Sequence, residues 1–181
     1  MREKATGAGN QQERSVVEMI PPNTGWYLAG FTDGEGSFNV STINRNQDFK
    51  TGWKISLSFN ISQRDVTVLQ VFLEHLQCGS LRKRKDGVTY YEVRRLDDLI
   101  NIVIPFFERF LLKSVSKRKQ FEVFRSIVEL VARKEHLSSQ GLEKIFLLRQ
   151  SIKVARKRKY TLEQILKVRQ SKSSEAIRLA N

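Results

Sequence analysis

An eleven-residue run from Trp53 to Gln63 alternates between apolar and polar side chains. Its odd positions up to residue 61 carry Trp, Ile, Leu, Phe and Ile, and its even positions carry Lys, Ser, Ser, Asn and Ser. A period of two is that of a β-strand, because successive side chains of a strand point to opposite faces. The run therefore predicts a strand with one face in the core and a polar face on the other side of a sheet.

Three further strands are expected around this one. Residues 37–43 form the preceding strand, and residues 79–85 and 88–95 flank Asp86-Gly87, a dipeptide that favours a tight type I′ hairpin turn. A helix over residues 65–76, with apolar side chains on one face, separates the two strand pairs. The expected order is α-ββ-α-ββ-α-α. This is an α+β fold of the ββαββα type, a four-stranded antiparallel sheet with helices on one face.

Capping residues and helix breakers place the other helices. The first is expected to start at Asn23 or Thr24 and to end at the Gly34-Glu35-Gly36 turn. The remaining expected helices are a short one from Asp97 that Pro105 ends or kinks, a longer one from Ser116, and two more over residues 139–155 and 161–172.

The chain is expected to form one domain between two tails. Residues 1–22 are polar and end in Pro21-Pro22, so we expect a flexible N-terminal tail. The domain then covers residues 23–172, with its core at 24–135 and C-terminal helices at 138–172. Residues 173–181 form the C-terminal tail.

The composition favours a nucleic-acid partner. The 181 residues include 32 Lys and Arg against 19 Asp and Glu, a net charge of +13, and a charge of this size usually indicates a polyanionic partner. Two segments carry most of it, residues 36–95 with a net charge of +5 and residues 113–181 with +12, whereas residues 26–35 carry −2. The basic run at 156–159 is expected to bind phosphates without reading bases.

Other classes of protein are disfavoured. The longest apolar stretch, residues 99–112, is far shorter than the roughly 20 residues that cross a bilayer, and the N-terminus lacks the apolar segment of a secretory signal. Cys78 has no second cysteine to pair with, and with His75 and His136 alone it makes no zinc site. An intracellular protein that is neither secreted nor membrane-bound is expected.

The polar face of the predicted sheet suits DNA. It mixes hydrogen-bonding groups with positive charge and has few acids, whereas an ordinary solvated sheet, the alternative interpretation, mixes both signs. The candidate DNA contacts are Asn39, Ser41, Arg45, Lys54, Ser56, Ser58, Asn60, Arg82, Arg84, Tyr90, Glu92 and Arg94, with Lys119 added from the basic start of the long helix.

Residues 28–36 read Leu-Ala-Gly-Phe-Thr-Asp-Gly-Glu-Gly. This segment resembles the signature of the LAGLIDADG homing endonucleases in its small residues, its two acids two positions apart and its closing glycine before a strand. The family also has the ββαββα order, so the resemblance covers about residues 24–135. It implies an intron-encoded, site-specific DNA endonuclease that makes a double-strand break with 3′ overhangs by metal-dependent phosphodiester hydrolysis.

The second acid of this segment, Glu35, lies just beyond the expected end of the helix. Ala29 and Gly30 lack bulk, so two such helices could approach closely and bring Glu35 and the Gly34 carbonyl of each side by side. Two carboxylates and two carbonyls make an all-oxygen site for a hard ion, so Mg²⁺ (or Mn²⁺) is the expected cofactor. Such an ion activates a water and stabilises both reacting oxygens of a phosphodiester.

Two further residues are carried over by the resemblance. Gln63 matches a polar residue that orients the active-site water, and Lys117 matches a basic residue near the scissile phosphates. With Glu35 they are the predicted catalytic residues. The chain departs from the family pattern at two positions. Glu35 stands where Asp is commoner, and Thr67 stands where some members carry a basic residue. This leaves one active-site cation unassigned, and Arg64 is the substitute considered for it.

One copy of the motif occurs in the sequence, and family members with one copy act as homodimers on pseudo-palindromic DNA. The expected interface residues are Trp26, Ala29, Gly30, Thr32 and Asp33. For Asp33, hydrogen bonds within its own turn are the alternative. A second function also stays open: a non-cleaving binder of the same fold, either an intron-RNA maturase with intron RNA as its partner or a transcription regulator.

Overall fold

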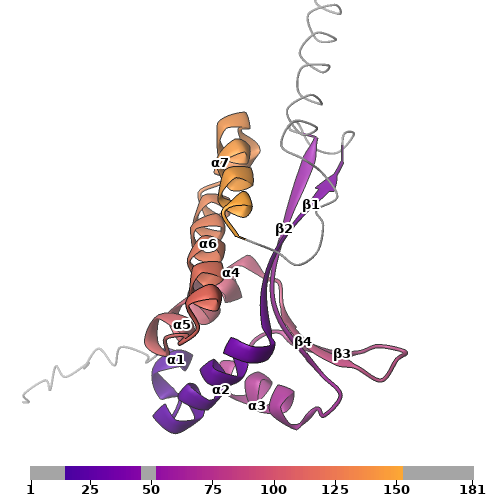
Figure 1. Cartoon of the computed structure of the whole chain (residues 1–181), viewed down its shortest axis with the longest axis vertical. Coiled ribbons are helices and arrows are strands. Elements are labelled where there is room, and N and C mark those ends of the chain that lie inside the picture. The colour runs from indigo at the N-terminus through magenta and orange to yellow at the C-terminus, as the bar shows by residue number, and fades with distance from the viewer. Residues whose placement is uncertain (1–14, 46–51, 153–181) are drawn as a thin grey trace, which may run out of the picture.

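The computed structural model describes residues 15–45 and 52–152 of the chain, which form one sheet with helices packed against one of its faces (Figure 1). The sheet has four antiparallel strands in the order β1-β2-β4-β3. The strands are β1 (Gly36–Asn44), β2 (Trp53–Gln63), β3 (Ser80–Lys83) and β4 (Thr89–Val93). The α+β architecture expected from the alternating runs is therefore confirmed.

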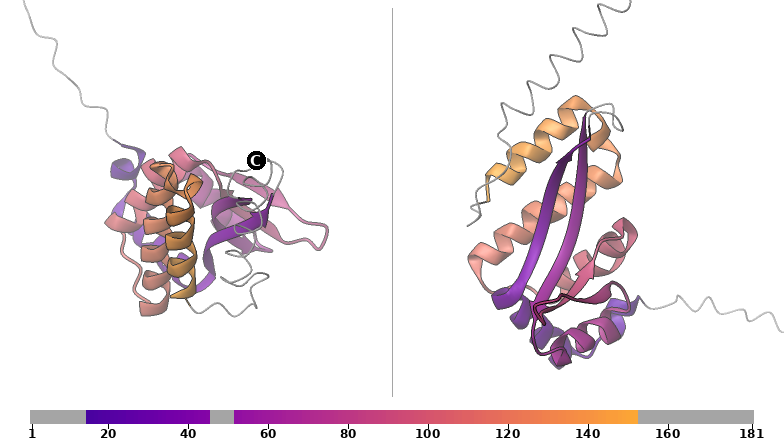
Figure 2. Two further views of the ribbon diagram at one scale, coloured as in Figure 1. Left: turned by 90° about the horizontal axis from the view of Figure 1, so that it is seen from above. Right: turned by 90° about the vertical axis from the view of Figure 1, so that its right-hand side faces the viewer.

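The strand register separates an apolar face from a polar face. Opposite residues of an antiparallel pair share a face, and Phe38 is opposite Phe59, which is opposite Val93. On the other face Asn39 is opposite Ser58, and Ser41 is opposite Ser56. The helices lie behind the β1–β2 hairpin in the right-hand view of Figure 2, so they cover the apolar face, and none of the described helices lies on the polar face.

Phenylalanine side chains fill the space between the sheet and the helices. Phe38 and Phe59 stack with ring centroids 5.3 Å apart, and Phe107 meets both rings edge-on, with its centroid 5.2 Å from that of Phe38 and 5.3 Å from that of Phe59. Such offset and edge-to-face pairs add to the free energy gained by burying the rings. The apolar half of the β2 alternation thus anchors the helical layer.

The helices that cover the sheet begin close to the expected positions. The principal ones are α2 (Pro22–Glu35), α3 (Thr67–Leu76), α6 (Val115–Ala132) and α7 (Ser139–Gln150). The first starts at Pro22 rather than at Asn23 or Thr24, because a proline suits the first helical turn, where its missing N–H needs no partner. Residues 153–155 of the helix expected over 139–155, the helix expected over 161–172 and the tail at 173–181 lie outside the described residues.

Pro105 does not end the helical segment around it. The chain runs through α4 (Leu96–Asp98), the π-helical turn η1 (Leu99–Val103) and α5 (Ile104–Arg109) without a break. The proline lies in the first turn of α5, directly after the wider π turn. The wider π turn makes room for the proline ring, which would otherwise clash with the preceding helical turn. At the position where the helix was expected to end or kink, it therefore changes from a π-helix to an α-helix and continues.

The β3–β4 hairpin forms as expected, although its strands are shorter and its loop is wider. The N–H of Arg84 donates to the carbonyl of Val88, and the N–H of Gly87 donates to the carbonyl of Arg84. Gly87 has a φ of +84°, which closes a three-residue loop in place of the expected two-residue type I′ turn. Among the described helices, none has the length and the apolar character that a membrane crossing requires.

Residues 15–22 are folded, so the expectation of a flexible tail over 1–22 is wrong for them. Helix α1 (Val16–Met19) is closed by a capping box between Ser15 and Glu18. Val17 and Ile20 are each only 3% exposed and belong to the main core. The guanidinium of Arg109 donates to the Val17 carbonyl, which ties α1 to α5.

Truncating Ile20 therefore tests whether this segment stabilises the domain. We expect Ile20→Ala to lower the free energy of unfolding by about 2–4 kcal/mol in urea titration, because the lost side chain leaves a cavity. Met19→Ala is the matched control, since Met19 is 58% exposed, and it should change the free energy by less than about 0.5 kcal/mol. Equal effects of the two variants would show that the segment is not part of the core.

Candidate active site

The candidate active site lies where α2 ends and β1 begins. Glu35 is the last residue of α2 and is exposed, and Gly36 is the first residue of β1. A side chain at Gly36 would have its Cβ 2.8 Å from the carbonyl oxygen of Thr32, so only glycine permits this close return of the strand over the helix end. The turn thus leaves the Glu35 carboxylate free at the surface.

Lys117 reaches this turn from α6. Its ammonium donates a hydrogen bond to the Gly36 carbonyl, across 81 positions in the sequence. Burial lowers the pKa of Lys117, while the negative charges of Asp33 and Glu35 act in the opposite direction. A partly desolvated cation therefore lies beside the acidic end of α2, and its assignment as a catalytic residue stays a prediction.

Asp33 holds α6 in this position. Its carboxylate accepts hydrogen bonds from the backbone N–H of Lys113 at 2.6 Å and from that of Ser114 at 3.2 Å. The Ser114 hydroxyl in turn accepts from the N–H of Lys117 and caps α6. Asp33 was expected at a dimer interface or in its own turn, whereas its carboxylate binds a distant segment of the same chain.

Gln63 lies at the end of β2, two residues beyond Ile61, which pairs with Gly36. The register therefore places it past the start of β1, at the end of the hairpin where α2 terminates. It lines a surface hollow of about 300 Å³ between α2 and α3, together with Tyr27, Phe31 and Thr67. Its assignment as a catalytic residue stays a prediction.

Neither Thr67, which stands where some family members carry a basic residue, nor Arg64, its possible substitute, contributes a positive charge at the Gly36 turn. Thr67 donates from its hydroxyl to Asp65 at 2.7 Å, so it belongs to the start of α3. The Arg64 guanidinium reaches towards Gly87, in the β3–β4 loop. Among the described residues, Lys117 places its ammonium at the turn, and the further family cation stays unassigned.

The oxygen donors at the turn fit part of a metal site. The Glu35 carboxylate and the Gly34 carbonyl are hard ligands of the kind that Mg²⁺ and Mn²⁺ prefer. Within residues 15–45 and 52–152, no group of three or more His, Cys, Asp and Glu side chains gathers to hold an ion. An ion held by the Glu35 carboxylate and the Gly34 carbonyl would need further oxygens to complete its coordination sphere.

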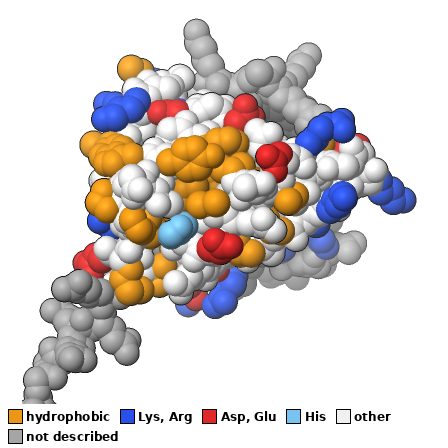
Figure 3. All heavy atoms as spheres, turned by 90° about the horizontal axis from the view of Figure 1, so that it is seen from below, with side chains coloured by type: hydrophobic (Ala, Val, Ile, Leu, Met, Phe, Trp, Pro, Cys, Tyr) orange, Lys and Arg blue, Asp and Glu red, His pale blue; other side chains and the backbone are white. Residues whose placement is uncertain are grey.

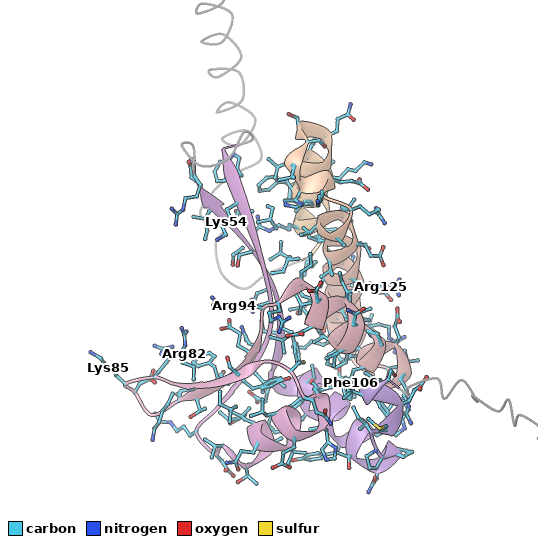
Figure 4. All side chains as sticks on the ribbon, turned by 180° about the vertical axis from the view of Figure 1, so that it is seen from behind. Lys54, Arg82, Lys85, Arg94, Phe106 and Arg125 are labelled. Carbon is cyan, nitrogen blue, oxygen red and sulfur yellow. The ribbon has the colours of Figure 1, made fainter. Side chains whose placement is uncertain are left out.

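The polar sheet face brings most of the predicted DNA contacts together. Asn60 is opposite Glu92, which is opposite Ser80, and Tyr90 is opposite Arg82, so these side chains share the face. Figure 4 shows Lys54, Arg82 and Lys85 along the sheet and its β3–β4 loop, with Arg125 on the helical side.

Several of these side chains have partners within the chain. Glu92 forms an ion pair with Arg94 at 2.9 Å, and Arg84, just past β3, donates to the Tyr90 hydroxyl at 2.9 Å. Ser58 is only 9% exposed, so it is less available to a ligand than its neighbours. Two other predicted contacts lie off the strands, with Arg45 directly after β1 and Lys119 on α6.

The exposed side of α2 carries glycines and aromatic rings. A Cβ built on Gly30 or Gly34 meets no atom within 4 Å, whereas Ala29 and Thr32 are 2% and 0% exposed and pack inside their own chain. The expectation that Ala29 and Thr32 lie at a dimer interface is therefore wrong. Figure 3 shows hydrophobic side chains gathered on the lower face of the molecule, and the exposed ones on α1 and α2 are Met19, Trp26 and Tyr27.

The family model described as LAGLIDADG endonuclease matches residues 28–128, which include the second half of α2, the whole sheet and most of α6. The chain belongs to the LAGLIDADG endonuclease family. The predicted motif at residues 28–36 thus has the structural context that the family requires.

Two curated relatives of this LAGLIDADG chain are named as endonucleases. It is 31% identical over 141 residues to "Probable intron-encoded endonuclease 2" of Neurospora crassa, a match that covers 76% of this chain and 29% of that protein. It is 32% identical over 126 residues to "DNA endonuclease I-CeuI" of Chlamydomonas moewusii, which covers 66% of this chain and 56% of the relative. The LAGLIDADG chain thus spans less than two thirds of either protein.

Solved structures of LAGLIDADG proteins share its fold. The homing endonuclease I-TnaI superposes with a TM-score of 0.69 at 31% identity, over 84% of this chain and 97% of that one. I-SmaMI bound to cleaved DNA superposes with a TM-score of 0.69 at 30% identity, over 81% of this chain and 48% of that one. The LAGLIDADG chain is thus similar to nearly all of one structure and to about half of the other.

Sequence reasoning missed the segment that Asp33 binds. Lys113 and Ser114 contribute backbone N–H groups, which every residue except proline has, so their residue types gave no signal. Ser114 itself carried a signal, because serine is a residue type that caps helices. A cap at Ser114, two positions before Ser116, would have placed the first residue of α6 at Val115.

Replacing Asp33 tests its link to α6 in this LAGLIDADG chain. We expect Asp33→Ala to speed hydrogen exchange of the Lys113 and Ser114 amides, because they lose their acceptor, and to lower the free energy of unfolding by about 1–2 kcal/mol. Asp65→Ala is the matched control, since it removes a comparable acceptor from the Thr67 amide. It should leave the exchange of the Lys113 and Ser114 amides unchanged, and unchanged exchange in Asp33→Ala would contradict the link.

Proposed function

We propose that this chain is a subunit of an intron-encoded, site-specific DNA homing endonuclease. It would make a double-strand break with 3′ overhangs in a long pseudo-palindromic target. The observation that carries the proposal is the meeting of Glu35 and Lys117 at the Gly36 turn, beside a polar sheet face that carries Lys54 and Arg82. Acting on DNA would place the protein inside the cell.

The relatives support this proposal by their names. The Neurospora crassa protein is named as intron-encoded, and I-SmaMI is bound to cleaved DNA in its structure. Because the chain spans only 29% of the first of these proteins and 48% of the second, the activity of the whole relatives does not transfer by similarity alone. The proposal therefore depends on the chain's own residues, and the experiments below change those residues.

The sheet would hold DNA, and the α2 end would hold the reacting phosphate. A β-ribbon fits the major groove, where hydrogen-bonding side chains distinguish the four base pairs. The face that would enter the groove carries Asn39, Ser56 and Asn60, with Lys54 and Arg82 to bind phosphates.

Each residue at the turn would have one task. Glu35 and the Gly34 carbonyl would bind Mg²⁺ or Mn²⁺, and the chemistry that such an ion supplies when bound is an activated water and stabilised reacting oxygens. Lys117 would neutralise charge on the scissile phosphate, and its hydrogen bond to Gly36 keeps its ammonium at the helix end. Gln63 would orient the attacking water, because its amide both donates and accepts.

A second copy of the chain would complete the site. Gly30 and Gly34 leave two neighbouring positions on the exposed side of α2 without a side chain, which would let two helix backbones approach closely there around a two-fold axis. The two Glu35 carboxylates would then lie near each other and supply the additional oxygens. The exposed Trp26, which packs edge-on against Phe110 with centroids 5.6 Å apart, would flank this contact.

Removing the Glu35 charge tests the catalytic assignment. We expect Glu35→Gln to cleave a plasmid carrying the joined flanks of the host gene at below about one hundredth of the wild-type rate in Mg²⁺, because a metal ligand is lost. DNA binding should persist, since no DNA-binding cation is removed. Glu122→Gln is the matched control, as it removes the same charge from the exposed side of α6 and should cut normally.

Two results would contradict this scheme. If Glu35→Gln cuts as fast as the wild type, the assignment of Glu35 to the metal is wrong. If the wild type binds the joined flanks but does not cut them, the chain is a non-cleaving binder, such as a maturase or a transcription regulator.

A bulky residue on the glycine face tests the dimer. We expect Gly30→Leu to keep its fold, because Gly30 is exposed and a Cβ there meets no atom within 4 Å, and to sediment as a monomer that no longer cuts. Gln140→Leu on α7 is the matched control, because it adds the same side chain at another exposed helical position. A Gly30→Leu protein that still sediments as a dimer would place the interface elsewhere.

A further inference from the structure

The far end of the β1–β2 hairpin has a hydrophobic cluster of its own. Trp53, Leu142 and Phe146 are 2%, 6% and 4% exposed and form a group separate from the main core, with Ile55 packed against it. The rings of Trp53 and Phe146 meet edge-on, with centroids 6.2 Å apart. Helix α7 thus contacts the hairpin through apolar side chains.

A polar contact joins the same two elements. The Arg149 guanidinium of α7 donates to the Thr42 hydroxyl of β1 at 3.2 Å, across 107 positions in the sequence. In Figure 1 and in the right-hand view of Figure 2, α7 lies beside the end of the β1–β2 hairpin that is furthest from α2. We call this hairpin end, residues 40–44 and 53–57, the outer ribbon.

Within the described residues, the two strands of the outer ribbon pair with each other and with no third strand. Strand β4 pairs with β2 only between Phe59 and Gln63, so within the described residues β2 before Phe59 pairs with β1 alone. A two-stranded ribbon is marginally stable by itself and needs packing against another element. Helix α7 supplies that packing through Phe146 and Leu142.

The side chains that pack against α7 alternate along β2 with predicted DNA contacts on the opposite face of the sheet. Trp53 and Ile55 alternate along β2 with Lys54 and Ser56, which point to the polar face because strand side chains alternate. The position of the Trp53 and Ile55 backbone therefore sets the position of Lys54 and Ser56.

The distance along the strand assigns these contacts to the outer part of a DNA half-site. Ser56 is opposite Ser41 and Lys54 is opposite Ile43, five and seven residue steps from Gly36, or about 17 and 23 Å at 3.3–3.4 Å per residue. For a ribbon laid along the DNA axis, at 3.4 Å per base pair, this is about five to seven base pairs from the reacting phosphate.

We propose that α7 is a brace that fixes the outer ribbon and thereby sets sequence specificity at the base pairs furthest from the cleavage point. Phe146 and Leu142 act as positioning residues, since they contact the ribbon and not the DNA-facing side. The proposal rests on the proposed DNA-binding function. It predicts that loosening the brace changes which outer bases are preferred and leaves the centre intact.

Selection from a library of random DNA duplexes tests the brace in the full chain. Wild type, Phe146→Ala and the milder Phe146→Leu are each used to select bound duplexes, and cleavage maps the centre of the selected sequence. We expect Phe146→Ala to lose about tenfold or more of its preference at the outer positions, the discrimination of one well-placed base contact. Preference near the centre and the cleavage rate should change less than twofold, and Phe146→Leu should fall between.

Ile20→Ala is the control, because it destabilises the domain through α1, far from the ribbon in sequence and packing. It should lower preference evenly or not at all. Preference that is unchanged in Phe146→Ala, or lost evenly along the target, would overturn the brace. Hydrogen exchange gives a second readout: amides of residues 53–57 should exchange faster in Phe146→Ala, while those of 59–63 should not.

The proposed function can fail separately from the brace. If the wild type selects no sequence, both the proposed function and the specificity role fail, and faster exchange of the ribbon amides would then show a purely structural brace. If the wild type selects and cuts a sequence but Phe146→Ala keeps the same preferences, only the brace fails.

Discussion

The carboxylate of Asp33 joins the end of α2 to the start of α6, and the candidate active site depends on this junction. The hydrogen bond from Lys117 to Gly36 and the packing of Phe121 against Phe38 also hold α6 against the start of β1. The two acids of the motif therefore divide the work. Asp33 binds its own chain, and Glu35, two positions on, keeps its carboxylate at the surface. Two positions on a helix point in different directions, which is why adjacent acids can have such different surroundings.

Alternating patterns and turn residues predicted most of the sheet and of the site. The β2 strand has the bounds expected from its alternation, because period two, burial and pairing all favour the same register. Lys117, which the resemblance assigns to catalysis, lies beside Glu35 in the structure, and its catalytic role stays a prediction. Local signals of this kind suffice where one face of an element is plainly apolar.

The sequence predicted less where burial depends on distant contacts. Helix α1 is four residues long, too short for a helical period, and Val17 and Ile20 are buried only because α5 and α3 lie against them. Helix α2 carries apolar side chains around much of its circumference, so the side that faces the core could not be read from spacing. Ala29 and Thr32 were consequently assigned to the exposed side, although both face the interior.

The separate cluster behind the outer ribbon has an evolutionary consequence. Trp53, Leu142 and Phe146 support that ribbon in addition to the main core, against which Ile55 also packs. Ser41, Lys54 and Ser56 point to the polar face, so substitutions that change which bases they meet would cost little of the stability on which the Glu35 turn relies. A lineage could adapt to a drifting or new insertion site by altering the ribbon while its cutting machinery stays constant.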